Sequence, residues 1–445
     1  MSAEASTSER PEKKVLVVAY YWPPSGGSGV QRWLKFVKYL PKLGWTPFVF
    51  TPENPSFQIK DDSLMKDVPP EAEVIRFPIW EPYGMFNWLS ALTGKKQVKQ
   101  TDLVATGKKS FMQRISGWIR GNLFIPDARI FWVKPSVEFL SDILKSNQIH
   151  TLVTTGPPHS LHLIGLRLKK KFPELRWIAD FRDPWSEWDL LDTFSMSAWA
   201  KRKHQRLERQ VLQTADRVMT IAPYHVNRLE QLGGRKVDLV TNGFDEDDFL
   251  IHQHKKTEQW TLRHIGMVDQ LRDPRPFMLA LKNVLTAHPD MVKNVKVEFI
   301  GSVNSVFREF IASEPVLSSV VRFTEPIPHE KLLQTYGETD VQLLVLAHTA
   351  IAPGNLPGKL FEYLASGNFI LGTGPSSGDA ANILSQTGAG VILERTDTHG
   401  IERVIRERYQ HWLKGSDGPP RNVERFTRRR LTERLVAVLE DRQLS

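Results

Sequence analysis

The chain has 445 residues, enough for two domains of ordinary size, and its 41% hydrophobic and 24% charged residues are typical of a folded globular protein. It contains no cysteine, which excludes disulfides, thiolate metal sites and cysteine nucleophiles. No apolar run approaches the ~20 residues of a membrane-spanning helix, and the net charge of +9 favours an anionic partner.

The polar N-terminus, residues 1–12, has no apolar segment of the kind that a secretory signal contains, and we expect it to be disordered. A buried-strand pattern follows at Lys14–Tyr21, then a glycine-rich loop at Trp22–Val30. A helical pattern begins at Gln31, and a second strand is expected at Trp45–Phe50. This order of strand, loop, helix and strand is the unit that builds parallel sheets.

Further patterns extend this first domain over residues 13–241. The expected elements are the strands Glu73–Phe77, Thr151–Thr155, Trp177–Phe181, Arg217–Ile221 and Val237–Thr241 and the helix Ser197–Thr214. Residues 80–134 form an insertion in which basic residues are interleaved with Trp and Phe. That composition suits contact with an anionic membrane or a lipid-carried acceptor, and the alternative is a solvated, partly packed insertion. Nucleic acid is a weaker candidate partner because no recognised binding motif accompanies the charge.

A second alternating series over residues 242–420 predicts another domain, entered through the acidic segment Asn242–Phe249. Its expected elements are the strands Trp260–Ile265, Val295–Ile300, Val320–Phe323, Val341–Val345 and Phe369–Gly372 and the helices Pro274–Ala287 and Pro328–Tyr336. An arginine-rich helical pattern occupies residues 421–445. Two such halves indicate an α/β protein of two facing Rossmann-like domains, with parallel sheets and an interdomain cleft. Ligands are expected at the carboxyl ends of the strands.

The most informative segment is Asn355–Gly374, which reads as a loop, a helix, a glycine stop and a short buried strand. A helix that begins after a Gly/Pro loop offers unpaired N–H groups and a positive dipole end to an anion. Lys359 and Glu362 are three residues apart and therefore share one face near that end. A cation beside a carboxylate can hold a diphosphate and a ribose diol together, and the alternative is an ordinary surface helix with one Lys–Glu pair.

The sequence Pro-Gly-Lys-Leu-Phe-Glu-Tyr-Leu-Ala-Ser-Gly at 357–367 closely resembles the donor-site helix of retaining glycosyltransferases of family 4 (glycosyl transferase group 1), which have the GT-B fold. The resemblance implies that Glu362 holds the nucleotide ribose, and we place Lys359 and the adjoining Leu360 in the same donor-binding set. Many members carry a second glutamate eight residues earlier, which contacts the donor sugar. Gly354 stands at that position here, so the pattern is incomplete and leaves the donor sugar open.

The resemblance also implies that the last helix, within 421–445, returns to brace the first domain. It implies retention at the anomeric carbon and no metal cofactor, with a nucleotide-diphosphate sugar as co-substrate. Asp245-Glu246-Asp247 formally matches a metal-binding DxD motif. We interpret it as a solvated acidic run in the interdomain loop and expect no metal there.

The loop Gly26–Arg32 resembles the family loop under the donor phosphates and the acceptor, and Gly26, Gly27 and Gly29 are its candidate residues. These glycines allow close backbone approach and present N–H groups; a tight turn without a ligand is the alternative. The loop does not match the GxGxxG fingerprint, which disfavours a nucleotide-dependent dehydrogenase.

Two further loops follow expected strands. His159 is a candidate acceptor or phosphate contact, whereas His162 is interpreted as structural, because a zinc pair on one helix would more usually be spaced i, i+4. Asp180, Arg182 and Asp183 follow the strand at 177–181. One carboxylate is expected to orient the acceptor hydroxyl while Arg182 positions it; the alternative is a structural ion pair. Many family 4 relatives have a histidine at this strand end, so the chain departs from them here.

In the segment His264–Arg275, family 4 enzymes usually place an arginine just after the glycine and a lysine a few residues later. Met267 stands at the first position here, and Arg272 or Arg275 is the candidate for the second. A guanidinium suits bidentate phosphate contact. We predict Arg272 and Lys359 as the cations that stabilise the leaving diphosphate.

Together these patterns predict a hexosyltransferase-type enzyme that passes a sugar from a nucleotide-diphosphate donor to a glycan or lipid-linked acceptor. Cell-surface polysaccharide or lipopolysaccharide biosynthesis is the expected pathway, and the cytoplasm, at the inner face of the membrane, the expected location. One alternative is a degenerate GT-B binding or scaffold protein, suggested by Gly354 and Met267. A nucleotide-sugar epimerase is another.

Overall fold

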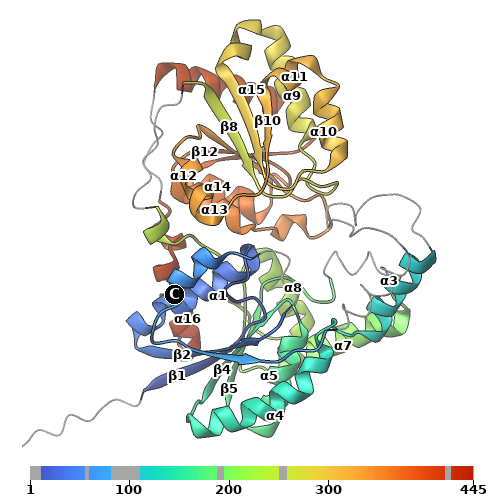
Figure 1. Ribbon diagram of the computed structural model, residues 1–445, viewed down its shortest axis with the longest axis vertical. Coiled ribbons are helices and arrows are strands. Elements are labelled where there is room, and N and C mark those ends of the chain that lie inside the picture. Colours follow the sequence, from blue (N-terminus) through green and yellow to red (C-terminus); the bar gives the residue numbers. More distant parts are fainter. Residues whose placement is uncertain are drawn as a thin grey trace, which may run out of the picture.

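The computed structural model describes residues 12–55, 60–81, 111–187, 195–249, 258–415 and 422–443. They form two α/β domains, one above the other in Figure 1, each built on a parallel sheet. The predicted α/β architecture with two parallel sheets is therefore confirmed. The expected N-terminal lead-in and residues 82–110 of the basic-aromatic insertion lie outside the described residues.

The N-terminal sheet has seven strands in the order β3-β2-β1-β4-β5-β6-β7. They are β1 (Lys13–Val18), β2 (Trp45–Pro52), β3 (Glu73–Phe77), β4 (Thr151–Gly156), β5 (Arg176–Phe181), β6 (Arg217–Thr220) and β7 (Asp238–Leu239). Apolar, largely β-branched runs such as Val15–Val18 are buried on both faces, as central parallel strands must be. The order reverses between β1 and β4, so the loops after these two strands flank a ligand-binding crevice.

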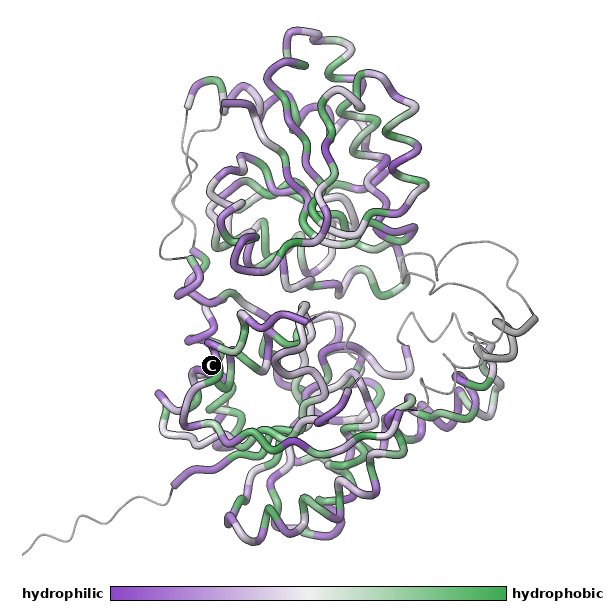
Figure 2. The backbone as a smooth tube through the Cα atoms, in the orientation of Figure 1, coloured by the Kyte–Doolittle hydropathy of each residue, from purple (hydrophilic) through white to green (hydrophobic). Residues whose placement is uncertain are grey.

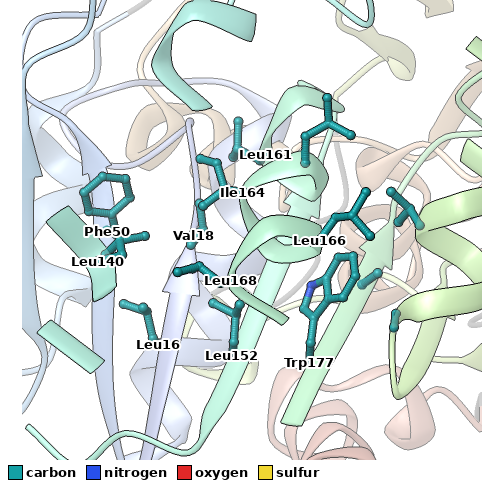
Figure 3. Close-up of a cluster of buried hydrophobic side chains, with 14 of the residues drawn as sticks. Leu16, Val18, Phe50, Leu140, Leu152, Leu161, Ile164, Leu166, Leu168 and Trp177 are labelled. Carbon is teal, nitrogen blue, oxygen red and sulfur yellow. The ribbon is translucent and has the colours of Figure 1, made fainter. Parts of the chain in front are cut away.

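Helices cover both faces of this sheet (Figure 1). They are α1 (Ser28–Tyr39), α4 (Ile130–Ser146), α5 (Ser160–Lys171), α7 (Ala198–Thr214) and α8 (Pro223–Gly233). The helix α3 (Phe111–Leu123) lies to one side of the sheet, where Asn122 is hydrogen-bonded to Ser195 and Ser197 just before α7. Figure 3 shows one core layer, in which Leu16 and Leu152 of the sheet pack with Leu140 of α4 and Ile164 of α5. Alternate strand residues and one helix stripe thus supply the buried apolar area that stabilises the domain.

The C-terminal sheet has six strands in the order β10-β9-β8-β11-β12-β13. The elements are β8 (Trp260–Ile265), α9 (Arg275–Ala287), β9 (Val295–Ile300), α10 (Ser305–Ala312), α11 (Pro315–Val320), β10 (Val321–Thr324), α12 (His329–Tyr336), β11 (Val341–Val345), α13 (Gly358–Ser366), β12 (Phe369–Thr373), α14 (Asp379–Thr387), β13 (Gly390–Leu393) and α15 (Thr398–Lys414). The edge strand β13 was not among the expected strands. Here the order reverses between β8 and β11, which places the second crevice there.

The last helix, α16 (Arg428–Leu439), returns to the N-terminal domain and lies beside α1 (Figure 1). Leu431 and Leu435 share a buried cluster with Val15 of β1 and Trp33 of α1. The chain passes between the two domains twice at this place. The two passages are hydrogen-bonded to each other, since the Phe244 N–H donates to the Phe426 carbonyl at 3.1 Å. The two crossings form one compact connection between the domains.

Hydropathy follows these layers: in Figure 2 the apolar segments run through the sheets and the inward faces of the helices. Within the described residues, no helix has the length and apolar character needed to cross a bilayer.

Candidate active site

The carboxyl ends of the two sheets meet at the domain boundary. Tyr224, which follows β6, donates its backbone N–H to the Asp379 carboxylate after β12 at 2.9 Å. A Cβ built on Gly354, after β11, would lie 2.7 Å from the Tyr224 ring and 2.9 Å from Nε2 of His225. The glycine that replaces the expected second glutamate therefore packs directly against the opposite domain.

Glu362, on α13, is held by two groups from α12. The Tyr336 hydroxyl donates to one carboxylate oxygen at 2.6 Å, and Nε2 of His329 lies 3.1 Å from the other. Burial would raise the pKa of Glu362, but these two contacts outweigh it and hold the pKa below its usual value. Glu362 is therefore an ionised acceptor whose remaining lone pairs can accept the hydroxyls of a diol.

Lys359 lies in the first turn of α13, as its predicted role requires. Its ammonium donates to the carbonyl of Ile265 at 3.0 Å and lies 3.4 Å from Nε2 of His264. Burial lowers the pKa of Lys359 to about 7, and the nearby Arg272 acts in the same direction. Two cations held close together, with a single carboxylate, Asp269, beside them, are typical of a phosphate-binding site.

The other predicted donor-binding residues of this domain, Arg272, Arg275 and Leu360, differ in where the structure places their side chains. Arg272 lies near Lys359 and is oriented by Asp269, whose carboxylate accepts from its Nη1 at 2.8 Å. Arg275 is instead paired with Asp273 at the start of α9. The prediction for Leu360 is wrong for the side chain, because it is fully buried in the core, and its N–H is bonded to the Pro357 carbonyl.

The predicted glycine loop opens α1, which begins at Ser28 and so includes part of the loop. Gly27 precedes the helix with a φ of 88°, a conformation that favours glycine. A Cβ at Gly29 would lie 3.2 Å from the Tyr21 ring, so this position is also sterically restricted. Gly26 and Gly27 leave the helix N-terminus accessible as an anion site.

Asp180 is fully buried, and its main partner is Arg32 of α1. Two hydrogen bonds of 2.9 and 3.1 Å join them, and Trp33 and Thr155 add bonds of 2.7 and 2.9 Å. Burial would raise the pKa of Asp180, but Arg32 outweighs it and lowers that pKa. Held by these four hydrogen bonds, Asp180 fixes α1 to the sheet, which corresponds to the structural ion pair given above as the alternative, with Arg32 in place of Arg182.

Arg182 joins three loops through their backbones. Its guanidinium donates to the carbonyl of Gly29 at 2.7 Å, to that of Gly156 at 3.2 Å, and to that of Pro157. Asp183, partly exposed, makes no hydrogen bond or ion pair within the described parts of the chain. Burial raises the pKa of Asp183, with Arg182 opposing. Asp183 is therefore the better of the two carboxylates for accepting a hydroxyl proton or hydrogen bond.

The two histidines after β4 lie in an aromatic stack. His159 stacks on Trp185 with ring centroids 5.2 Å apart, and burial holds its pKa well below its usual value. His162 lies 4.4 Å from Phe181 and is bonded to the Thr154 hydroxyl at 2.9 Å; burial lowers its pKa to about 3. Both rings are neutral, and His159, only 4% exposed, offers little surface to an acceptor.

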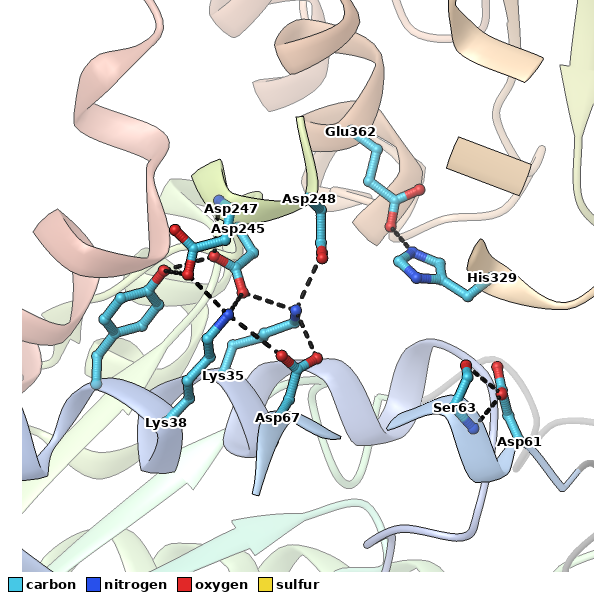
Figure 4. A network of polar contacts seen from close by, with 11 residues as sticks. Lys35, Lys38, Asp61, Ser63, Asp67, Asp245, Asp247, Asp248, His329 and Glu362 are labelled. Carbon is cyan, nitrogen blue, oxygen red and sulfur yellow. Dashed lines mark hydrogen bonds and ion pairs between the residues drawn. The ribbon is translucent and has the colours of Figure 1, made fainter. Parts of the chain in front are cut away.

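The interpretation of the acidic run as solvated was wrong for Asp245, which is buried, whereas Asp247 is exposed. Asp67, Asp245 and Asp248 lie close enough to hold a cation, and the ammonium of Lys35 occupies the position between them at 2.8, 2.7 and 3.0 Å (Figure 4). Burial would lower the pKa of Lys35, but these carboxylates outweigh it and raise that pKa. The network is a set of ion pairs that connects α1 to the crossing segment.

Sequence reasoning did not single out Arg32, Lys35, His264, His329 or Tyr336. His329 could have been found from its place at the start of α12, just after the carboxyl end of β10. Arg32 and its partner Asp180 are 148 residues apart, and Lys35 and Asp245 are 210 residues apart, so no local pattern joins either pair.

Residues 26–243 match the family model described as the glycosyl transferase 4-like domain. No curated protein sequence matches the chain significantly. Among solved structures, a glycosyltransferase from Rickettsia africae is similar, with a TM-score of 0.60, 12% identity, and 97% of this chain and 99% of that chain covered. Sucrose-phosphate synthase from Thermosynechococcus elongatus is similar with a TM-score of 0.55 and 13% identity, and 96% of this chain and 95% of that chain are covered. WaaG, a glycosyltransferase involved in lipopolysaccharide biosynthesis, is similar with a TM-score of 0.56 and 13% identity, and 96% of this chain and 99% of that chain are covered.

These likenesses cover both domains, and the matched family model contains the glycine loop, the Asp180–Asp183 strand end and the histidine stack. They agree with the resemblance found at the donor-site helix, which lies in the other domain. The chain therefore has the GT-B fold, and its residues 26–243 match the glycosyl transferase 4-like domain.

Proposed function

We propose that the enzyme transfers a hexose, with retention, from a nucleotide-diphosphate donor to a hydroxyl of a glycan or lipid-linked acceptor. The observation that carries this proposal is the placement of Lys359 and Glu362 on one helix at the interdomain boundary. The ammonium suits a diphosphate, and the carboxylate suits a ribose diol. Cell-surface polysaccharide or lipopolysaccharide assembly is the proposed pathway, supported by the fold likeness to WaaG.

In this proposal the bond between the anomeric carbon and the diphosphate breaks as the acceptor oxygen bonds to the same carbon. Lys359 and Arg272 stabilise the negative charge that develops on the departing diphosphate. Asp183 accepts a hydrogen bond from the acceptor hydroxyl and orients it. For retention, the hydroxyl proton passes to an oxygen of the leaving diphosphate, on the same face of the sugar. No residue in this scheme requires a metal ion.

The acceptor is proposed to be presented at an anionic membrane surface on the cytoplasmic side. Large apolar side chains, all about half exposed or more, gather around α3 and the start of α7: Trp80, Trp118, Leu123, Phe131 and Trp199. Trp80 packs edge-on against Phe131, and the Lys203 ammonium lies 4.8 Å from the centre of a Trp199 ring. Aromatic side chains beside cations suit the headgroup region of an anionic bilayer.

Vesicle co-sedimentation tests the membrane part. The protein should sediment with vesicles that contain anionic lipid and less with purely zwitterionic ones, and Trp80→Ala with Trp199→Ala should weaken that binding. Leu279→Ala, which removes an exposed apolar side chain from the other domain, is the matched control. Equal binding by the double variant and the control would refute this surface.

Product analysis tests the reaction. A panel of uridine, guanosine, adenosine, thymidine and cytidine diphosphate sugars is incubated with membrane extract as the acceptor source, and the anomeric configuration of the product is read by NMR. A product with the donor's configuration supports the proposal, and an inverted one refutes retention. Epimerised donor without any acceptor would indicate the epimerase. Binding without turnover would favour the scaffold alternative, which the packing of Gly354 against the opposite domain also suits.

A further inference from the structure

His264, at the end of β8, is fully buried directly beneath the predicted diphosphate site. Its Nδ1 lies 2.9 Å from the Leu343 carbonyl of the neighbouring strand β11, and its Nε2 lies 3.4 Å from the Lys359 ammonium. The ring therefore connects the two strands that flank the crevice to the first turn of α13. No other role for this histidine was identified above.

The hydrogen-bonding partners determine the tautomer. A carbonyl only accepts, so Nδ1 must carry the proton that it donates to Leu343. Burial, reinforced by the neighbouring Lys359, keeps the pKa of His264 far below its usual value, so the ring is neutral. Nε2 then carries a lone pair. The Met267 backbone also interacts with the ring, and Lys359 is the donor side chain that the described residues place beside Nε2.

The Lys359 ammonium has three N–H groups, and the structure gives two of them a partner, the Ile265 carbonyl and His264 Nε2. Gly266 lies against it as well: a Cβ there would be 3.4 Å from Nζ. The charged groups that face Lys359 are Arg272, which repels it, and Asp269, which attracts it. The third N–H remains for a ligand, in a direction fixed by the other two.

We propose that His264 is a positioning residue that holds the Lys359 ammonium, protonated and correctly aimed, for the diphosphate of the donor. This inference rests on the proposed function, since it assumes that Lys359 contacts a diphosphate. His264 acts only through Lys359. It supplies an acceptor that favours the charged amine in a site where burial and Arg272 disfavour it.

The test compares His264→Phe, which keeps a ring but has no acceptor, with His264→Gln, whose amide oxygen can replace Nε2. Tyr363→Phe is the matched control: it removes a hydrogen bond to the Ile265 N–H at the same strand end without touching Lys359. The first readout is the pH dependence of Lys359 acylation, followed by mass spectrometry without any nucleotide. The second is calorimetric binding of uridine, guanosine, adenosine, thymidine and cytidine diphosphates, with Lys359→Ala included.

The wild type should acylate with a midpoint near 7, the pKa of Lys359. His264→Phe should shift that midpoint to lower pH and weaken nucleotide binding about tenfold at neutral pH, because a charge-assisted hydrogen bond is lost. His264→Gln should restore both, and Tyr363→Phe should change neither.

Three outcomes would overturn the inference. The first is an unshifted acylation midpoint in His264→Phe, which needs no ligand to observe. The second is nucleotide binding that is lost in Lys359→Ala but equal to wild type in His264→Phe; the proposed function then stands and the role of His264 falls. The third is wild type that binds none of the diphosphates, which refutes the proposed function itself. If His264→Phe fails to fold, His264→Asn, too short to reach Nζ, replaces it.

Discussion

The buried charges of the two crevices differ in how completely they are satisfied. In the N-terminal domain, Asp180 accepts four hydrogen bonds from Arg32, Trp33 and Thr155, two of them from a guanidinium of opposite charge. In the C-terminal domain, Lys359 contacts only neutral acceptors and has another cation, Arg272, beside it. Asp269, the carboxylate nearby, is bonded to Arg272 and not to Lys359. A charge bonded to its counter-ion holds the fold, whereas one with no directly bonded counter-ion is available to a ligand. Composition and burial alone would not separate them.

The largest effect is expected where the satisfied pair is broken. Asp180→Ala leaves the Arg32 guanidinium buried without its partner, which should lower the free energy of unfolding by about 3–5 kcal/mol. Denaturant unfolding measures it. Asp183→Asn, three residues away, is the control and should be at least as stable as wild type, because it leaves no buried charge without a partner. Equal losses of stability in the two variants would contradict the assignment of a structural role to Asp180 alone.

The unsatisfied charge should show the opposite behaviour, a loss of activity with little loss of stability. Lys359→Met should lower kcat/KM by about 10²–10³-fold, the usual effect of removing one group that stabilises transition-state charge. In wild type, kcat/KM should fall as pH rises through about 7, because the free enzyme then loses the Lys359 proton. Lys331→Met, at an exposed position of α12, should keep wild-type activity and its pH profile.

Asp183→Asn should sharpen the comparison within one strand end. Activity should fall about 10²-fold if the carboxylate orients the acceptor hydroxyl. The pKa of Asp183 is raised in the folded state, so its ionised form opposes folding, and wild-type stability should decline as pH rises through the interval above the usual carboxylate pKa. The variant should lack that decline. Full turnover by Asp183→Asn would remove the residue from the acceptor site.

A smaller effect is expected at the domain contact. Gly354→Ala places a Cβ within 3.0 Å of Tyr224 and His225, so the contact must open or shift, at a cost of about 1–3 kcal/mol. Small-angle scattering and thermal unfolding measure the change. Gly117→Ala is the matched control, since a Cβ there meets nothing within 4 Å. An unchanged scattering profile and melting temperature in Gly354→Ala would mean that the contact is not part of the solution structure.

The smallest effect is expected at His329. Burial lowers its pKa, but Glu362 raises it more, so the net shift is upward. The stabilisation should be fully present below the unfolded histidine pKa and be lost as pH rises through the raised folded value. Removing the side chain with His329→Ala should therefore cost about 1–2 kcal/mol at acidic pH and less at alkaline pH. A difference between wild type and variant that does not change with pH would refute the charged pair.

Much of the architecture could be predicted because it is encoded locally. The strands Glu73–Phe77, Trp260–Ile265, Val295–Ile300 and Val341–Val345 coincide with those in the structure, since short segments rich in β-branched and aromatic residues favour strands. The donor helix could be predicted as well, because a proline directly precedes it and a glycine directly follows it in the sequence. β13 was missed because Gly390–Leu393 is short and lies at the sheet edge.

The site was less predictable, because its partners are distant in sequence. Arg182 lies between two carboxylates in the sequence, yet it donates to three backbone carbonyls, and Asp180 pairs with Arg32 instead. The acidic run at Asp245 was interpreted as solvated because nothing local indicates Lys35 and Lys38, which approach it from α1. Leu360 follows a donor-site lysine, but the helix turns it into the core.

The most direct test of the central claim is a thermal-shift screen of the purified protein against uridine, guanosine, adenosine, thymidine and cytidine diphosphates, with magnesium or with EDTA. A ligand that binds only the folded state must raise the melting temperature. The account predicts that one nucleotide stabilises the protein equally with and without metal, and that Glu362→Ala abolishes the shift. No shift with any nucleotide, or a shift that survives in Glu362→Ala, would contradict it.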